Sequence, residues 1–103
     1  IKLITRPSAQ VIAPYEGHVA FVGEFRGYGQ LLIIEHSEGY HTLLAGMSRI
    51  DSIMGQKVLI GEPVGIMDSS SDAKPVLYVE LRRQGRPVNP LPWLAQRGSS
   101  TQG

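Results

Sequence analysis

The three histidines are the side chains in this chain that could bind a metal, and two of them lie close together in the sequence. His36 and His41 flank Ser37-Glu38-Gly39, a segment typical of a hairpin turn, and Glu35 precedes the pair. A catalytic zinc needs about three protein ligands and a water. His18 is the third histidine, and there is no cysteine to complete a site. We therefore predict structural or surface roles for the histidines and no metal site, with an adventitious metal at His36 and His41 as the alternative.

A second group of candidate residues alternates along one predicted strand, residues 76–82. Side chains two positions apart lie on the same face of a strand, so Val76, Tyr78, Glu80 and Arg82 share a face. Tyrosine and arginine are enriched among the residues that dominate binding energy at protein interfaces. The residues alone leave two interpretations open: a contact surface, or an exposed strand face with solvated charges.

Length and composition indicate one globular domain. The chain has 103 residues, of which 42% are hydrophobic and 18% charged. Its formal net charge of +1 provides no electrostatic drive towards nucleic acid or anionic lipid. No apolar run approaches the ~20 residues of a membrane-spanning helix. We expect a domain over residues 1–95 and a flexible tail over 96–103, and, because the chain begins at Ile1 without methionine, a longer parent protein.

Short apolar runs separated by glycine and proline predict an all-β sandwich or barrel. The predicted strands are residues 19–22, 31–36, 40–45 and 77–82, with two very short strands within 55–67. Residues 31–36 and 40–45 should form a hairpin, and the continuous apolar run 31–34 predicts burial on both faces. The best candidate for a short helix is 47–53. Residues 68–75 read as a polar loop, and Trp93 is expected to pack in the core.

Several segments, in order along residues 3–94, resemble the LytM or lysostaphin-type (M23) peptidase domain. Residues 11–19 are similar to V-x-A-P-x-x-G-x-V, and 27–36 are similar to G-Y-G-x-x-x-x-I-x-H. Residues 42–47 fall where the family has T-x-Y-x-H-L. Residues 55–65 match G-x-x-V-x-x-G-x-x-I-G, 78–82 match H-F-E-x-x and 85–90 match G-x-x-x-N-P. The resemblance implies an antiparallel β-sandwich with short strands and Gly-rich turns.

The resemblance also implies that the zinc chemistry of such peptidases is missing here. Carried over by position, the last histidine ligand is Tyr78, and a phenol with a pKa near ~10 is a poor zinc ligand. The two catalytic histidines correspond to Val76 and Gly46, and the aspartate ligand corresponds to Lys2. We therefore expect a catalytically inactive domain without a cofactor.

Inactive domains of this kind resemble the EnvC and NlpD type of activator, and residues 77–85 and 89–94 look most like the EnvC branch. The resemblance implies a periplasmic protein of a Gram-negative cell envelope that activates an N-acetylmuramoyl-L-alanine amidase during cell division. In this interpretation a groove of the domain binds a regulatory helix of the amidase. The expected groove residues are Tyr78, Arg82, Val76, Gly46, Tyr28, Glu80 and Lys2.

Three alternatives remain open from the sequence. One is a zinc-dependent cell-wall endopeptidase with unusual ligands. Another is a peptidoglycan-binding module whose groove holds a peptide or sugar, and peptidoglycan is also a possible second partner of an amidase activator. The third is a lipoyl-carrier-like barrel, which needs an exposed hairpin lysine; Lys74, beside Pro75, is a weak candidate.

Overall fold

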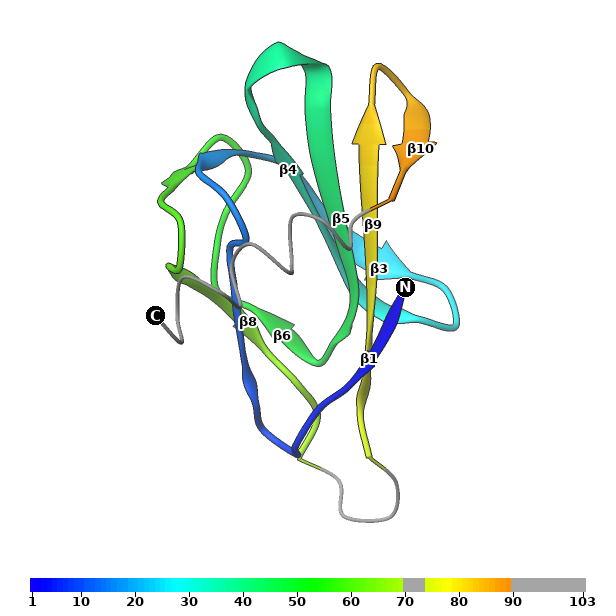
Figure 1. Cartoon of the computed structure of the whole chain (residues 1–103). Coiled ribbons are helices and arrows are strands. Elements are labelled where there is room, and N and C mark those ends of the chain that lie inside the picture. Colours follow the sequence, from blue (N-terminus) through cyan, green and yellow to red (C-terminus); the bar gives the residue numbers. More distant parts are fainter. Residues whose placement is uncertain (70–73, 90–103) are drawn as a thin grey trace, which may run out of the picture.

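The computed structural model describes residues 1–69 and 74–89, which fold into two antiparallel β-sheets (Figure 1). The strands are β1 (Lys2–Ile4), β2 (Gln10–Ile12), β3 (Gly17–Phe25), β4 (Gly29–Glu35), β5 (Tyr40–Met47), β6 (Arg49–Ile50), β7 (Lys57–Val58), β8 (Pro63–Ile66), β9 (Val76–Arg83) and β10 (Arg86–Val88), and η1 (Ser37–Gly39) is a 3-10 turn. The larger sheet has the order β1-β9-β5-β4-β3-β7, with β10 also paired to β9. The smaller sheet has the order β2-β8-β6. The all-β prediction is confirmed.

The hydrophobic core lies between the two sheets. Alternation along the long strands directs every second side chain into it, as at Leu77 and Val79 of β9, which are almost fully buried. The core consists of Val11, Ala13, Val19, Leu32, Ile34, Leu44, Met47, Val58, Val64, Met67, Leu77 and Val79. The other face of the larger sheet is here called the outer face.

The predicted hairpin is confirmed, because β4 and β5 pair antiparallel around η1. The predicted burial of 31–34 on both faces is only half right. Leu32 and Ile34 are fully buried in the core, whereas Leu31 and Ile33 are half-buried on the outer face. Pro63 starts β8, as expected of a residue without an N–H to donate to a ladder.

The predicted short helix over 47–53 is wrong, since this segment completes β5 and forms β6. The Ser48 N–H donates to the Ile66 carbonyl at 3.0 Å, and the Asp51 N–H donates to the Val64 carbonyl at 2.8 Å. Pairing with β8 therefore satisfies the backbone groups that a helix would have used internally. The predicted domain end at residue 95, the tail 96–103, Trp93 and residues 70–73 of the polar loop lie outside the described residues.

Candidate functional site: a groove on the outer face

Strand register arranges the outer face into rows of side chains that cross the larger sheet. Tyr78 lies opposite Lys2 of β1 on one side and opposite Ala45 of β5 on the other. The next row contains Glu80, Leu43, Ile33 and Phe21, and the row after it contains Arg82, His41, Glu35, His18 and Lys57. The outer face is thus apolar at its centre and charged along one margin.

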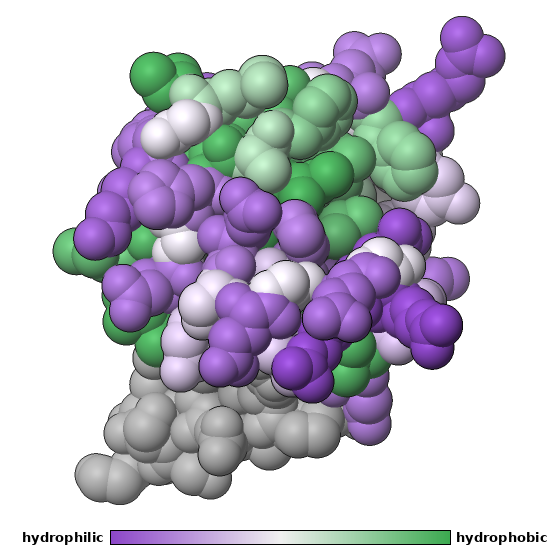
Figure 2. Space-filling view, turned by 90° about the horizontal axis from the view of Figure 1, so that it is seen from above, coloured by the Kyte–Doolittle hydropathy of each residue, from purple (hydrophilic) through white to green (hydrophobic). Residues whose placement is uncertain are grey.

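A groove of about 620 Å³ lies over this face. Its walls and floor are formed by Ile1, Lys2, Phe25, Leu31, Leu43, Ala45, Tyr78, Val79, Glu80 and Arg82. In the space-filling view, apolar side chains gather in one area of the visible surface, bordered by hydrophilic side chains (Figure 2). The groove itself combines apolar residues from β3, β4 and β5 with tyrosine and charged residues from β1 and β9.

Aromatic rings form one wall of the groove. The rings of Phe25 and Tyr28 stack with centroids 5.1 Å apart, and the Tyr28 ring meets the Tyr78 ring edge-on, also at 5.1 Å. The Lys2 ammonium lies over the Tyr78 ring, 5.7 Å from its centroid. Ring packing of this geometry and a cation over a ring each add roughly 0.5–1.5 kcal/mol. Lys2 and Tyr78 are therefore held together, although they are far apart in the sequence.

Arg82 is fixed by a neighbour on its own strand. Its Nε donates to Glu80 Oε1 at 2.6 Å, and both side chains are about two-fifths exposed. Such a pair adds little to stability, ~0–1 kcal/mol, but it orients the guanidinium along the groove margin.

Four of the seven expected groove residues, Lys2, Tyr78, Glu80 and Arg82, line the groove. Tyr28 supports it through Tyr78. Gly46 and Val76 are adjacent to each other but are not among the lining residues. A Cβ atom at Gly46 would lie 2.3 Å from the Val76 carbonyl oxygen, and the Gly46 backbone has φ +109°. This glycine is therefore required by the backbone, and does not merely clear space in the groove.

The apolar floor is not among the groove residues predicted from the sequence. The sequence analysis placed Leu31, Leu43 and Ala45 in strands but did not predict that they or Phe25 line a groove. Successive side chains of a strand point to opposite faces, so Leu31 and Leu43 lie on the face opposite Leu32 and Leu44. This alternation could have identified them as outer-face residues. The sequence could not show that these faces curve together into one groove.

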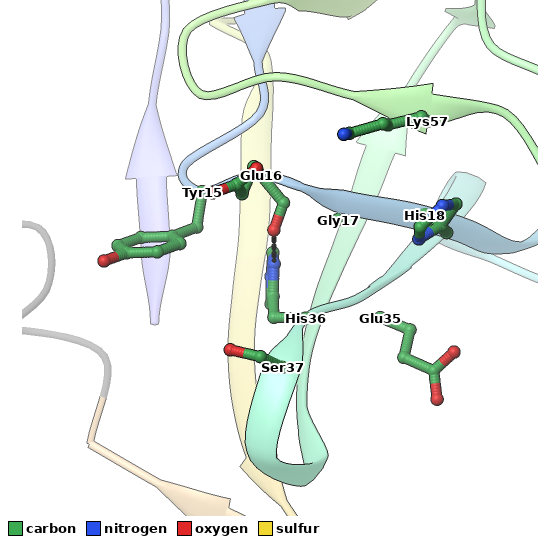
Figure 3. A pocket seen from close by; sticks show the side chains of 8 residues that line it. All are labelled: Tyr15, Glu16, Gly17, His18, Glu35, His36, Ser37 and Lys57. Atoms are coloured by element: carbon green, nitrogen blue, oxygen red, sulfur yellow. Dashed lines mark hydrogen bonds between the residues drawn. The ribbon is translucent and has the colours of Figure 1, made fainter.

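A second cavity lies at the margin of the sheet, between the turn before β3 and the end of β4 (Figure 3). We call it the histidine pocket; it has a volume of about 340 Å³ and is lined by Tyr15, Glu16, Gly17, His18, Glu35, His36, Ser37 and Lys57. His41 lies outside it, with Nε2 3.7 Å from Glu35 Oε2. No group of three or more His, Cys, Asp or Glu side chains within residues 1–69 and 74–89 is arranged to hold a metal ion.

His36 has a structural role at the back of the histidine pocket. Its Nδ1–H donates to the Glu16 carbonyl at 2.7 Å, and its Nε2, 2.6 Å from Thr42 Oγ1, accepts from that hydroxyl in the neutral ring. Both ring nitrogens are thus occupied. Burial lowers the pKa of His36 below its usual value, helped by the positive charge of nearby His41 and opposed by the bond to Glu16. The predicted structural role is supported for this histidine.

Protonation of His36 should weaken the fold. Because its pKa is lower in the folded than in the unfolded chain, the unfolded state binds more protons between the two values. The free energy of unfolding should therefore fall as the pH drops below about 6.5 and level off below the folded pKa. Urea unfolding between about pH 7.5 and 5 and the NMR titration of the His36 ring would measure this. A His36 ring that titrates at or above pH 6.5 would contradict this prediction. As a control, the pH dependence of the unfolding free energy should persist in the His18→Gln variant.

Sequence and structure comparisons place this chain in a known family. The model of the family described as "Peptidase family M23" matches residues 1–90. The chain belongs to peptidase family M23. As the sequence resemblance predicted, its fold is the antiparallel LytM/M23 type.

Among curated relatives, the chain is 39% identical over 88 residues to the Lipoprotein NlpD/LppB homolog of Pseudomonas aeruginosa, covering 84% of this chain and 30% of that protein. It is 35% identical over 88 residues to the Murein hydrolase activator EnvC of Escherichia coli, covering 84% of this chain and 21% of the relative. The chain therefore spans less than a third of either protein.

Among solved structures, the catalytic domain (A109H mutant) of the prophage-encoded M23 protein EnpA from Enterococcus faecalis superposes with a TM-score of 0.75 at 32% identity. The match covers 87% of this chain and 73% of that domain. Within the described residues, no helix is long and apolar enough to cross a membrane.

Proposed function

We propose that this domain is a catalytically inactive M23 domain that binds and activates a periplasmic N-acetylmuramoyl-L-alanine amidase during cell-wall remodelling and division. A relative with 35% identity carries the name murein hydrolase activator. The groove is the proposed binding site, and Tyr78, Arg82, Glu80 and Lys2 are its proposed contacts.

The pairing of Lys2 with Tyr78 is the observation that carries this proposal. By the family resemblance, these positions belong to the aspartate and histidine ligands of zinc. Here an ammonium lies 5.7 Å from the centre of a phenol ring, on strands paired in register. A cation repels a metal ion, and a phenol hydroxyl is a poor zinc ligand in place of an imidazole. These two residue types support binding over hydrolysis.

The shape and charge of the groove suit an amphipathic helix. Leu31, Leu43 and Ala45 offer an apolar floor, and a helix would place apolar side chains at i, i+3, i+4 and i+7 on it. Lys2 and Arg82 at the margins would favour acidic residues beside that stripe. A regulatory helix that blocks the amidase would fit this groove if its apolar stripe is flanked by acidic side chains.

Activation would then be a shift between two states of the amidase. The domain must bind the helix in the open amidase more tightly than in the closed one. A difference of ~5.5 kcal/mol would raise the open state from 1% to 99% of molecules. Binding alone provides this energy, and no bond needs to be cleaved by the domain.

The test against the peptidase alternative uses the purified domain and a purified amidase of the same organism. We expect substoichiometric zinc by elemental analysis, no release of labelled peptidoglycan by the domain alone, and a complex with the amidase in sedimentation. Stoichiometric zinc together with lysis by the domain alone would establish the endopeptidase alternative. Binding to peptidoglycan in the groove without any complex with the amidase would establish the binding-module alternative.

A further inference from the structure

We propose that the histidine pocket is a second binding site, for a neutral saccharide such as the N-acetylated glycan backbone of peptidoglycan. Its walls come from the turn before β3, from β4 and η1, and from β7, at the margin of the sheet away from Tyr78 and Lys2. The choice of glycan rests on the proposed cell-wall function, whereas the existence of the site rests on the pocket alone.

The pocket is lined by polar side chains from neighbouring strands, and three of them have no partner within the described part of the chain. Lys57 lies directly opposite His18 across β7 and β3, and His18 lies opposite Glu35 across β3 and β4. In Figure 3, Lys57 extends over Gly17, with His18 and Glu35 to one side and Tyr15 to the other. Among the described residues, the side chains of Glu16, His18 and Lys57 make no hydrogen bond or ion pair. These groups are available to a ligand.

The pocket is preorganised by His36. Its two hydrogen bonds connect the turn at Glu16 to the end of β4 and to Thr42 of β5. The Tyr15 ring meets the His36 ring edge-on with centroids 6.1 Å apart. Because these walls are fixed before binding, a ligand loses little affinity to ordering the protein.

The mixture of groups selects a neutral polar ligand. Two carboxylates, Glu16 and Glu35, outnumber the single ammonium of Lys57, so phosphate or a free carboxylate would be repelled. A sugar hydroxyl both donates and accepts, which matches a lysine donor, carboxylate acceptors and the hydroxyl of Ser37. The Tyr15 side chain, 47% exposed, offers an apolar ring face for the C–H face of a sugar. The volume of about 340 Å³ lies at the lower end of the ~300–1,000 Å³ typical of ligand pockets.

The test is an NMR titration of the whole chain with the tetramer of N-acetylglucosamine. We expect shifts of the backbone amides of residues 15–18 and 35–37. Tyr15→Ala and Lys57→Met should each weaken binding about tenfold, the equivalent of one lost contact of ~1.4 kcal/mol. Tyr28→Ala is the matched control, because Tyr28 is 46% exposed and also meets another ring edge-on, but lies in the turn between β3 and β4, away from the histidine pocket. It should leave saccharide binding unchanged.

Four outcomes would overturn the proposal. The first three are no shifts at millimolar saccharide, shifts confined to the groove, and binding that is unaffected by both Tyr15→Ala and Lys57→Met. The fourth is preferential binding of a free stem peptide over the saccharide, which would assign the pocket to a peptide instead. Because no amidase is present, these outcomes are independent of activation. If the domain bound the saccharide but did not activate the amidase, only the proposed function would be refuted.

Discussion

Tyr78→Ala should abolish activation of the amidase while the domain remains folded. Tyr78 lies at the centre of the groove wall, between Lys2 and Tyr28, and aromatic anchors in such positions contribute ~2 kcal/mol or more to binding. We expect at least about a 30-fold loss of affinity for the amidase, by titration calorimetry and in a dye-release assay of peptidoglycan cleavage. Arg82→Glu should have a similar effect, because it reverses the charge at the groove margin and places a second carboxylate beside Glu80.

The controls for these variants are well matched. Tyr40 is also a half-buried strand tyrosine with a cation over its ring, Arg83 at 5.0 Å, but it does not line the groove. Tyr40→Ala and Arg86→Glu should therefore retain activation. The thermal midpoint of Tyr78→Ala should fall by no more than ~4–8 °C, which corresponds to a loss of about 1 kcal/mol of stability, so the domain should remain folded at 25 °C. Full activity of both groove variants, or their unfolding, would show that the binding surface lies elsewhere.

Gly46→Ala should destabilise the domain severely, and Gly46→His should unfold it, not restore a catalytic histidine. A non-glycine residue at φ +109° is strained by ~1–3 kcal/mol. In addition, its Cβ would lie 2.3 Å from the Val76 carbonyl oxygen, so β5 and β9 would have to separate. We expect Gly46→Ala to lose at least about 3 kcal/mol of unfolding free energy in urea titrations.

Gly55→Ala separates the steric contribution from the strain. Gly55 also has a positive φ, +87°, but a Cβ there would meet nothing within 4 Å. It should cost only about 1 kcal/mol. Equal losses for the two alanine variants would show that β5 adapts to a side chain at position 46, and would reopen the possibility of rebuilding a metal site.

The sequence predicted those features that depend on local alternation. The period of two along β9 placed Tyr78 and Arg82 on one face and Leu77 and Val79 on the other, as the burial pattern confirms. The turn at Ser37–Gly39 likewise set the β4–β5 hairpin. Lys2 could be located only by counting residues in a family pattern, and the structure places it opposite Tyr78.

Features set by long-range pairing could not be predicted in the same way. The hydrophobic pattern of residues 47–53 has neither a clear helical nor a clear strand period. This segment forms a strand because it pairs with β8, which follows later in the chain. The constraint on Gly46 comes from a carbonyl at Val76, on a strand 30 residues away in sequence. The histidine pocket needs three separate segments to meet, and the structural role predicted for His36 depends on bonds to Glu16 and Thr42 that the sequence does not specify.

The most direct test of the central claim is the rate at which a purified periplasmic amidase releases dye-labelled peptidoglycan, measured with and without this domain. We predict that the domain releases nothing by itself, with or without added zinc, but increases the rate of the amidase in a saturable manner. Lys2→Glu should reduce this increase by weakening the groove margin. An amidase rate unchanged by saturating wild-type domain, or release by the domain alone, would contradict the account.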